Sequence, residues 1–166
     1  MIRFFVAPEE LSGQTARLTG ENARHAKVLR LKQGEEVLLC DGGGEEWLCK
    51  VEDSEEFCLS LVDHRPSSSE AAVRVSVYMA FPKADKLEHV IQKATELGAY
   101  EIVTFPSARC VSRPDDKSLK KKLERWQKIA ASAAEQSGRG VIPQVLVLDS
   151  YQSALQRAAL ADKALL

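Results

Sequence analysis

The hydrophobic pattern of this sequence changes at Arg65-Pro66-Ser67-Ser68-Ser69-Glu70, and the change limits which folds the chain can adopt. This stretch contains a proline and three consecutive serines, a composition typical of a linker. Apolar segments before it are short and strand-like, whereas strand and helix patterns alternate after it. The sequence therefore predicts an α+β protein of two domains, at residues 1–66 and 73–166, joined by a linker at residues 67–72.

The first predicted domain is rich in short strands. A helix is expected at Glu21–Leu29, and Asp41-Gly42-Gly43-Gly44 has the composition of a hairpin turn. The expected strands are Ile2–Val6, Val37–Cys40, Trp47–Val51 and Phe57–Val62. Several short strands separated by glycine turns favour a small β-barrel, because an open sheet would leave long edges exposed.

The second predicted domain alternates strands with helices. Apolar residues at every second position from Val73 to Phe81 predict a strand with one buried face. Asp85 and Glu88 resemble a capping box, and an apolar stripe from Leu87 to Leu97 predicts a helix that ends at Gly98. The remaining expected elements are a strand at 101–105, a helix at 117–137, a strand at 145–148, a helix at 151–159 and the start of a strand at 163–166. This order predicts a parallel sheet covered by helices, and an end on a new strand predicts that the domain is truncated.

The composition of the sequence indicates in which cellular compartment the protein is expected. No apolar run reaches the ~18 residues of a membrane span, and the N-terminus lacks the features of a secretory signal, so a cytoplasmic protein is expected. Cysteines 40, 49, 58 and 110 form no C-x-x-C pair. We interpret them as small buried hydrophobes in a reducing compartment, with a zinc site as the alternative, and expect no metal.

Charge is divided unequally between the two parts of the chain. Residues 1–70 carry 8 basic and 14 acidic side chains, whereas residues 71–166 carry 15 basic and 10 acidic ones. Within the acidic part, Arg24, Lys27 and Arg30 surround His25 at spacings that put them near one helix face. This group is either a phosphate-contact patch or a solvated helix face.

The basic second part offers further candidate contacts. Lys83, Lys86 and Lys93 lie on or just before a predicted helix, and Arg109 and Arg113 follow a strand end, where open α/β sheets place their ligand sites. Solvent-exposed lysine and arginine side chains without a binding role would give the same sequence pattern. The sequence has no G-x-G-x-x-G, Walker A or nucleophile-elbow motif, which weighs against a nucleotide- or metabolite-binding α/β protein.

Glu135-Gln136-Ser137-Gly138-Arg139 closes the long predicted helix. Gly138 suits a helix C-terminus, but a cap alone does not explain the polar residues around it. Arg139 has a planar guanidinium that can grip a phosphate. Alternatively, its charge simply complements the negative end of the helix dipole.

Four stretches of the sequence resemble the bacterial family of 16S ribosomal RNA uridine-N3 methyltransferases, members of the SPOUT class. They are His25–Arg30 with Gly34 and the Asp41-Gly42 turn; Lys86–Glu88 with Ile91–Gly98; Ser107–Cys110; and Lys122–Ala130 with Ala134–Arg139 and Pro143. The resemblance runs over the whole chain, and its most specific segments are Lys-Ala-Thr-Glu-Leu-Gly and Glu-Gln-Ser-Gly-Arg.

This resemblance implies a PUA-like β-barrel followed by an α/β domain with a trefoil knot. It implies S-adenosylmethionine as methyl donor, 16S rRNA in the small ribosomal subunit as substrate, and a homodimer. The family's Gly-Pro-Glu-Gly-Gly donor motif is missing from this sequence, so the donor site is expected C-terminal to Leu166.

The same resemblance directs attention to particular arginines. Arg139 and Arg109 are the expected catalytic residues, in contact with the uridine or its phosphate, and Arg3, Arg24 and Arg30 are expected to place the RNA on the barrel. Lys83, Lys86, Lys93 and Arg113 are further expected RNA contacts. The competing hypothesis is a ribosomal-RNA-binding protein without catalytic activity, which requires no missing residues.

Overall fold

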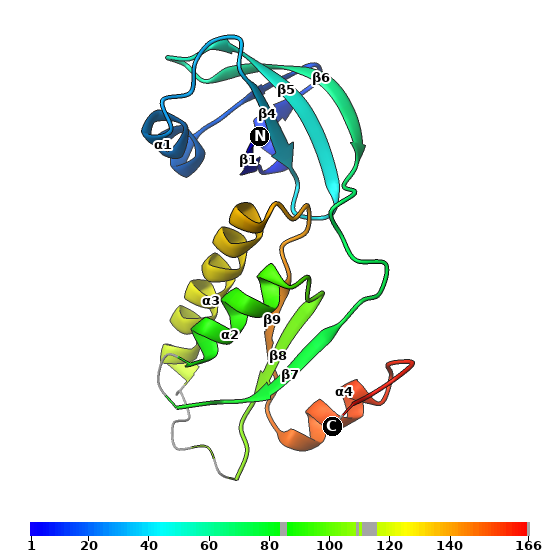
Figure 1. Ribbon diagram of the computed structural model, residues 1–166. Helices are drawn as coiled ribbons and strands as arrows, with labels where there is room; N and C mark the ends of the chain where they lie inside the picture. Colours follow the sequence, from blue (N-terminus) through cyan, green and yellow to red (C-terminus); the bar gives the residue numbers. More distant parts are fainter. Residues whose placement is uncertain (84–85, 109, 111–115, 166) are drawn as a thin grey trace. The chain divides into compact units, whose positions relative to one another are not determined.

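The computed structural model describes residues 1–83, 86–108, 110 and 116–165. The chain forms two compact units (Figure 1). The first unit comprises Met1–Glu70 together with Glu135–Ile142, and the second comprises Ala71–Ala134 and Pro143–Leu166. A segment late in the sequence, Glu135–Ile142, thus folds with the N-terminal part of the chain.

A curled six-stranded sheet forms the first unit (Figure 1). Its strands run in the order β1-β4-β5-β6-β3-β2, antiparallel except for the β1–β4 pair. Within residues 1–66, all of them described, the edge strands β1 and β2 are not paired with one another, so the sheet curls without closing into the predicted barrel. The elements are β1 (Ile2–Phe5), η1 (a 3-10 helix, Pro8–Glu10), β2 (Leu11–Ser12), β3 (Thr15–Arg17), α1 (Gly20–Val28), β4 (Glu36–Cys40), β5 (Glu45–Asp53) and β6 (Cys58–Pro66).

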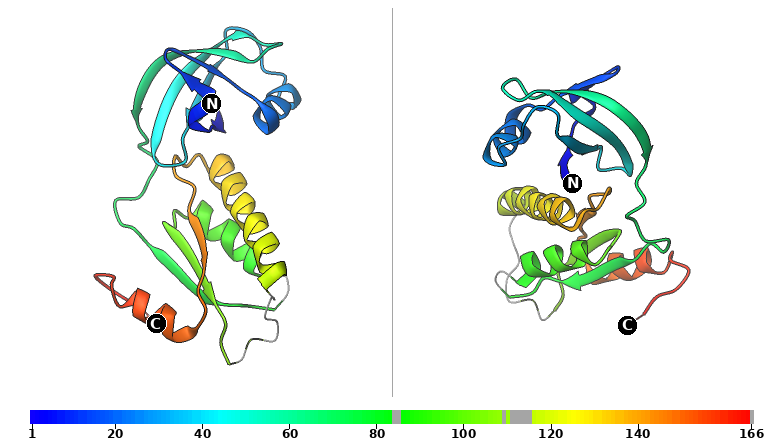
Figure 2. Two further views of the ribbon diagram at one scale, coloured as in Figure 1. Left: turned by 180° about the vertical axis from the view of Figure 1, so that it is seen from behind. Right: turned by 45° about the horizontal axis from the view of Figure 1, so that its top comes forward.

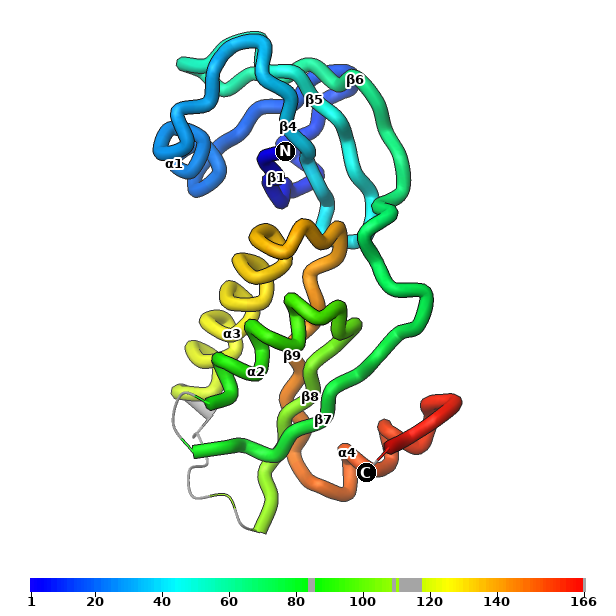
Figure 3. Tube along the Cα trace, in the orientation of Figure 1, coloured from blue at the N-terminus to red at the C-terminus, as the bar shows by residue number. Residues whose placement is uncertain are grey.

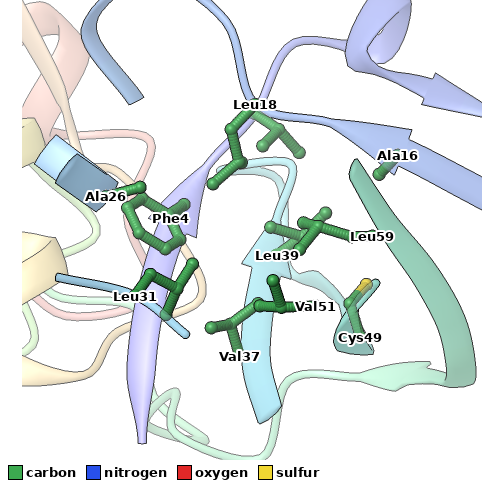
Figure 4. Close-up of a cluster of buried hydrophobic side chains, with 11 residues drawn as sticks. Phe4, Ala16, Leu18, Ala26, Leu31, Val37, Leu39, Cys49, Val51 and Leu59 are labelled. Carbon is green, nitrogen blue, oxygen red and sulfur yellow. The ribbon is translucent and has the colours of Figure 1, made fainter. Parts of the chain in front are cut away.

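The core of this unit fills the concave side of the sheet (Figure 4). Alternate residues of each strand point inward, and α1 contributes the fully buried Ala26. The largest fully buried members are Phe4, Leu39, Leu59, Val37 and Val51. Each such side chain stabilises the fold by about 1.5–3 kcal/mol when it leaves water. Cys40 and Cys49 are also buried in this unit, as the sequence predicted, while Cys58 is partly exposed.

The second unit contains the predicted parallel sheet. Strands β7 (Ser76–Ala80), β8 (Glu101–Phe105) and β9 (Gln144–Val147) lie in the order β7-β8-β9, and every residue of β8 is buried. Helices α2 (Lys86–Glu96) and α3 (Asp116–Ser137) lie on one side of the sheet and α4 (Tyr151–Ala158) on the other (Figure 2). Contacts from Tyr151 to Phe105 and from Arg157 to Glu101 hold α4 on β8.

Several sequence predictions for the second unit were wrong in detail. Val73 and Val75 precede β7 and are 70% and 52% exposed, because strand pairing begins only at Ser76. Leu97 is 87% exposed, since α2 ends at Glu96 and the chain turns at Gly98 with a φ of 92°. Lys163–Leu165 is exposed and forms no strand. The predicted capping residue Asp85 lies outside the described residues.

Two differences also arise in the first unit. Strand β6 extends through Pro66 and so takes up residues that the sequence assigned to a loop, because it pairs with β5 as far as Glu45. The short strands β2 and β3 were not predicted, since they contain few apolar residues. No helix in the described part of the chain combines the length and apolar character needed to cross a membrane.

Candidate functional site

The loop after α3 is held against the β4–β5 turn within the first unit (Figure 3). Gly138 ends the helix with a φ of 74°, a conformation that glycine adopts without strain. Val141 then forms β-bridges with Gly42 and Gly43, and the Ile142 N–H donates to the Gly42 carbonyl over 3.1 Å. The glycine turn predicted as a hairpin connection therefore also pairs with Val141 and Ile142, which follow the Glu-Gln-Ser-Gly-Arg segment.

Arg139 forms a buried ion pair with Glu70. Its Nη2 donates to Glu70 Oε2 over 2.6 Å, and its Nε donates to the same carboxylate over 3.2 and 3.4 Å. The N–H groups of Gly140 and Val141 donate to Glu70 Oε1 over 3.0 and 3.1 Å. Burial opposes ionisation of Glu70, but the hydrogen bonds and charge of Arg139 outweigh it, so the pKa of Glu70 is lowered.

A second ion pair lies in the same unit. Arg3 donates from one nitrogen to Glu46 Oε1 over 2.5 Å and to the backbone carbonyl of Arg139 over 3.2 Å. Ser67 donates to the same Glu46 oxygen over 2.5 Å. Burial would raise the pKa of Glu46, yet the hydrogen bonds from Ser67 and Arg3 lower it. Arg3 and Glu46 thereby connect the sheet to both the serine stretch and the loop after α3.

Glycine is required where the serine stretch meets this loop. A Cβ atom at Gly140 would overlap both Oγ and Cβ of Ser67. The Gly140 N–H donates to Ser69 Oγ over 3.0 Å as well as to Glu70. The residues read as a linker therefore make specific contacts in the first unit.

Helix α1 presents the basic group predicted from the sequence. Arg24 and Lys27 are exposed on the helix, but Arg30 lies beyond its end with a φ of 55°, so the three residues do not share one helical face. His25 Nδ1 lies 3.2 Å from Glu135 Oε1, which joins α1 to the end of α3. Burial raises the pKa of Glu135, although His25 opposes the shift.

The remaining predicted site residues are dispersed. Lys83, Lys86 and Lys93 are exposed on the second unit, and Lys93 pairs with Glu96 over 2.8 Å. Arg109 and Arg113 lie outside the described residues. Among the described candidates, the structure places Arg3 and Arg139 in one buried network and Arg24 and Arg30 on an exposed surface.

A pocket of about 750 Å³ lies at the carboxyl ends of the strands of the second unit. Open α/β sheets bind their ligands at this edge. Its described lining is mostly apolar, with Lys120 and Asp149 as charged members. Hydrogen bonds from Ser153 lower the pKa of Asp149, so this side chain is a carboxylate at neutral pH.

The described part of the chain contains no group of three or more His, Cys, Asp or Glu side chains that could hold a metal ion. Two of its cysteines, Cys40 and Cys49, are buried. Burial raises the pKa of Cys40 and of Cys49 to about 11, which keeps both thiols protonated and poorly nucleophilic at neutral pH.

Sequence reasoning missed Glu46 and Glu70, the carboxylate partners of the two predicted arginines. It also missed Ser67, which donates to Glu46, and Ser69, which accepts from the Gly140 N–H. Glu46 lies opposite Cys40 in the β4–β5 register, a pairing that no local pattern reveals. Glu70 and the serines have the composition of a solvated linker. The available signal was an acidic residue at the end of an otherwise uncharged serine run.

Comparisons with known proteins agree over nearly all of the chain. A family model described as an RNA methyltransferase domain matches residues 69–166, and one described as an RNA methyltransferase PUA domain matches residues 18–62. The ribosomal RNA small subunit methyltransferase E of Bacillus subtilis is 38% identical over 172 aligned positions, which cover 98% of this chain and 66% of that protein.

Solved structures give the same result. The ribosomal RNA small subunit methyltransferase E from Neisseria gonorrhoeae bound to S-adenosyl methionine superposes with a TM-score of 0.81 at 33% identity, over 95% of this chain and 66% of that one. A methyltransferase from Legionella pneumophila in complex with the same cofactor gives a TM-score of 0.79 at 27% identity, over 99% and 68%. This chain therefore spans about two thirds of the length of these relatives.

Proposed function

We propose, from the premise that this chain belongs to the RNA methyltransferase family, that the protein transfers a methyl group from S-adenosylmethionine to N3 of a uridine in 16S rRNA. The match of the family model to residues 69–166 carries the proposal. The resemblance found in the sequence is confirmed at the level of the family. The uridine, its N3 position and the donor are inferred for this chain from that resemblance and from its relatives.

The first unit is proposed to place the RNA. It matches the PUA domain of RNA methyltransferases and exposes Arg24, Lys27 and Arg30 around α1. Cations on such a surface release counterions from phosphates, which makes binding depend steeply on salt. Arg3, whose side chain is 11% exposed, is the less accessible of the predicted contacts on this unit.

The donor site is proposed to lie mainly C-terminal to Leu166, in a knotted SPOUT domain of which residues 73–166 form one part. The described residues do not fit a complete site for S-adenosylmethionine. The pocket at the strand ends is mostly apolar and offers Lys120 and Asp149 as its charged lining. The full-length protein is proposed to be a cytoplasmic homodimer.

Transfer to N3 of uridine requires removal of a proton from that nitrogen and an exposed base edge. A base in structured RNA must leave its stack before N3 is accessible. A nearby cation would stabilise the negative charge that develops on the uracil oxygens. Arg139 and Arg109 are the proposed sources of that charge, and Lys83, Lys86, Lys93 and Arg113 the proposed additional RNA contacts.

The test uses small ribosomal subunits that lack the modification, incubated with methyl-labelled S-adenosylmethionine and either this chain or a version extended to the length of its relatives. A methyl group at N3 blocks Watson–Crick pairing, so reverse transcription should stop at the modified uridine. Label in the rRNA without such a stop would reject the N3 assignment. Binding of subunits by the extended protein without label would favour the non-catalytic RNA-binding alternative.

The RNA surface is tested separately by the salt dependence of binding. Arg24→Ala or Arg30→Ala should reduce the slope of log K against log salt by about 0.7–0.9 for each phosphate that the variant no longer neutralises. Arg17→Ala is the matched control, because Arg17 is exposed on the same unit and pairs with Glu56. Equal slopes for all three variants would exclude α1 as the contact surface. Arg3→Ala belongs in the same series and shows whether Arg3 contacts RNA at all.

A further inference from the structure

We infer that Arg139 and the N–H groups of Gly140 and Val141 form an anion site, the anion cradle, which Glu70 fills and which accepts an RNA phosphate when Glu70 withdraws. The identity of the phosphate as part of RNA rests on the proposed function. The existence of the site does not, because it follows from the donors around Glu70.

The donors of the anion cradle converge as they do around bound oxyanions. Two consecutive backbone N–H groups, of Gly140 and Val141, point at one oxygen of Glu70, an arrangement that also makes anion-binding concavities in loops. The fork of Arg139 holds the other oxygen over 2.6 and 3.2 Å. The same fork geometry suits a phosphate and a carboxylate equally. The pKa of Glu70, lowered mainly by Arg139 against the effect of burial, agrees with a site that favours negative charge.

Glu70 is the removable part of this arrangement. Its side chain is 23% exposed, whereas that of Arg139 is 5% exposed. Its neighbours Ser69 and Ala71 are exposed and belong to no helix or strand. Rotation of the Glu70 side chain would therefore open the anion cradle to solvent without breaking a regular element.

The carboxylate of Glu46 differs from that of Glu70 in burial and in position, and serves as an example of a permanent ion-pair partner. Glu46 is 4% exposed, lies within β5 and is paired on both sides by strands. Its backbone is fixed by the strands on both sides and its side chain has almost no access to solvent. The difference between the two glutamates supports an exchangeable role for Glu70.

Phosphate itself is the probe in the first experiment, which needs neither RNA nor a methyl donor. The 166-residue chain is titrated with inorganic phosphate in place of chloride at constant ionic strength, by calorimetry and thermal unfolding. Glu70→Gln and Glu70→Ala should bind phosphate roughly tenfold or more tightly than the unmodified chain, with a rise in Tm. The double variant Glu70→Ala/Arg139→Ala should lose this gain. Glu45→Gln removes an equal charge from an exposed pair with His64 and should change nothing.

The second experiment measures binding of a small-subunit rRNA fragment. Glu70→Gln should strengthen binding and steepen its salt dependence by about one phosphate contact. Folded Glu70 variants with no gain in phosphate affinity would overturn the anion cradle. Failure of both Glu70→Gln and Glu70→Ala to fold would overturn it as well, because Glu70 would then be a permanent structural partner of Arg139. Phosphate binding without any effect on RNA would keep the site and reject RNA as its ligand, which separates this inference from the proposed function.

Discussion

The two units handle buried polar groups differently. In the first unit, Glu46 and Arg139 are buried with charged partners: Arg3–Glu46 joins two strands of the sheet, and Glu70–Arg139 joins the end of the serine stretch to the loop after α3. In the second unit, β8 is covered on both faces, and its fully buried Thr104 hydroxyl has no hydrogen-bond partner among the described residues. In the second unit the buried Glu101 lies within β8 and pairs with Arg157 of α4, so buried charge there joins two regular elements. In the first unit Arg139 and Glu70 instead hold irregular backbone.

This difference follows from the backbone. Helices and strands satisfy their own N–H and C=O groups, so side chains around them can be apolar. Loops leave such groups unpaired, and a buried loop needs side-chain partners. The Glu70 carboxylate is such a partner, because it accepts from the N–H groups of Gly140 and Val141. The pair of Arg139 and Glu70 therefore marks the place in the first unit where two loops meet.

The largest effect of this difference is expected at Glu46. Glu46→Ala would leave Arg3 buried without a counter-charge, and removal of one partner of a buried pair typically costs about 3–5 kcal/mol. Glu88→Ala breaks the exposed pair with Arg125 in the second unit and should cost less than about 1 kcal/mol. Urea unfolding at pH 7 measures both. Similar losses for the two variants would show that buried charge is not what holds the first unit together.

Gly140→Ala should have the next largest effect. The new Cβ would overlap Ser67, and such overpacking typically costs about 1–3 kcal/mol. Ser67→Gly removes the atoms that would be struck, so the double variant should recover part of the loss relative to Gly140→Ala alone. Gly98→Ala has open space around its Cβ but a φ of 92°, and reports the cost of backbone strain without a clash. Additive losses in the double variant would rule out the clash with Ser67.

Acid should weaken the first unit through the same two carboxylates. Glu46 and Glu70 have lowered pKa values in the fold, so their contribution is fully present above the ordinary glutamate pKa and is lost as pH falls through the lower folded values. Unfolding free energies between about pH 5 and 3 should therefore fall less steeply in Glu46→Gln than in the unmodified chain.

The pKa of Glu135 is shifted in the opposite direction, so its effect on stability in acid has the opposite sign. Its raised pKa means that its ionised form opposes folding at neutral pH, and protonation relieves this as the pH falls. Glu135→Gln should therefore steepen the loss of stability in acid relative to the unmodified chain. If the stability of the Glu46 and Glu135 variants changed with pH in the same way, the opposite pKa shifts given to these two residues would be wrong.

Sequence reasoning recovered most of the regular elements and missed the contacts between loops. The strand Glu101–Phe105 and the helix ending at Ser137 follow from strong apolar periodicity and glycine signals, and both were placed correctly to within a residue. Strand β6 was placed too short because pairing with β5 overrides the composition of Arg65-Pro66. The pairing of Arg139 with Glu70 depends on a separation of 69 residues, which no local pattern encodes.

The smallest effect on the free energy of unfolding is expected at Thr104, whose buried hydroxyl has no hydrogen-bond partner among the described residues. Thr104→Val keeps the shape of the side chain and removes a buried hydroxyl that lacks a partner among the described residues, which should stabilise the chain by about 1 kcal/mol. Thr95→Val is the matched control, since the Thr95 hydroxyl donates to the Ile91 carbonyl over 2.8 Å and its removal should bring no gain. Urea unfolding of the three chains under one set of conditions measures both changes. A destabilised Thr104→Val chain would mean that this hydroxyl has a hydrogen-bond partner in solution, and that β8 depends on Thr104 as well as on the pair of Glu101 with Arg157.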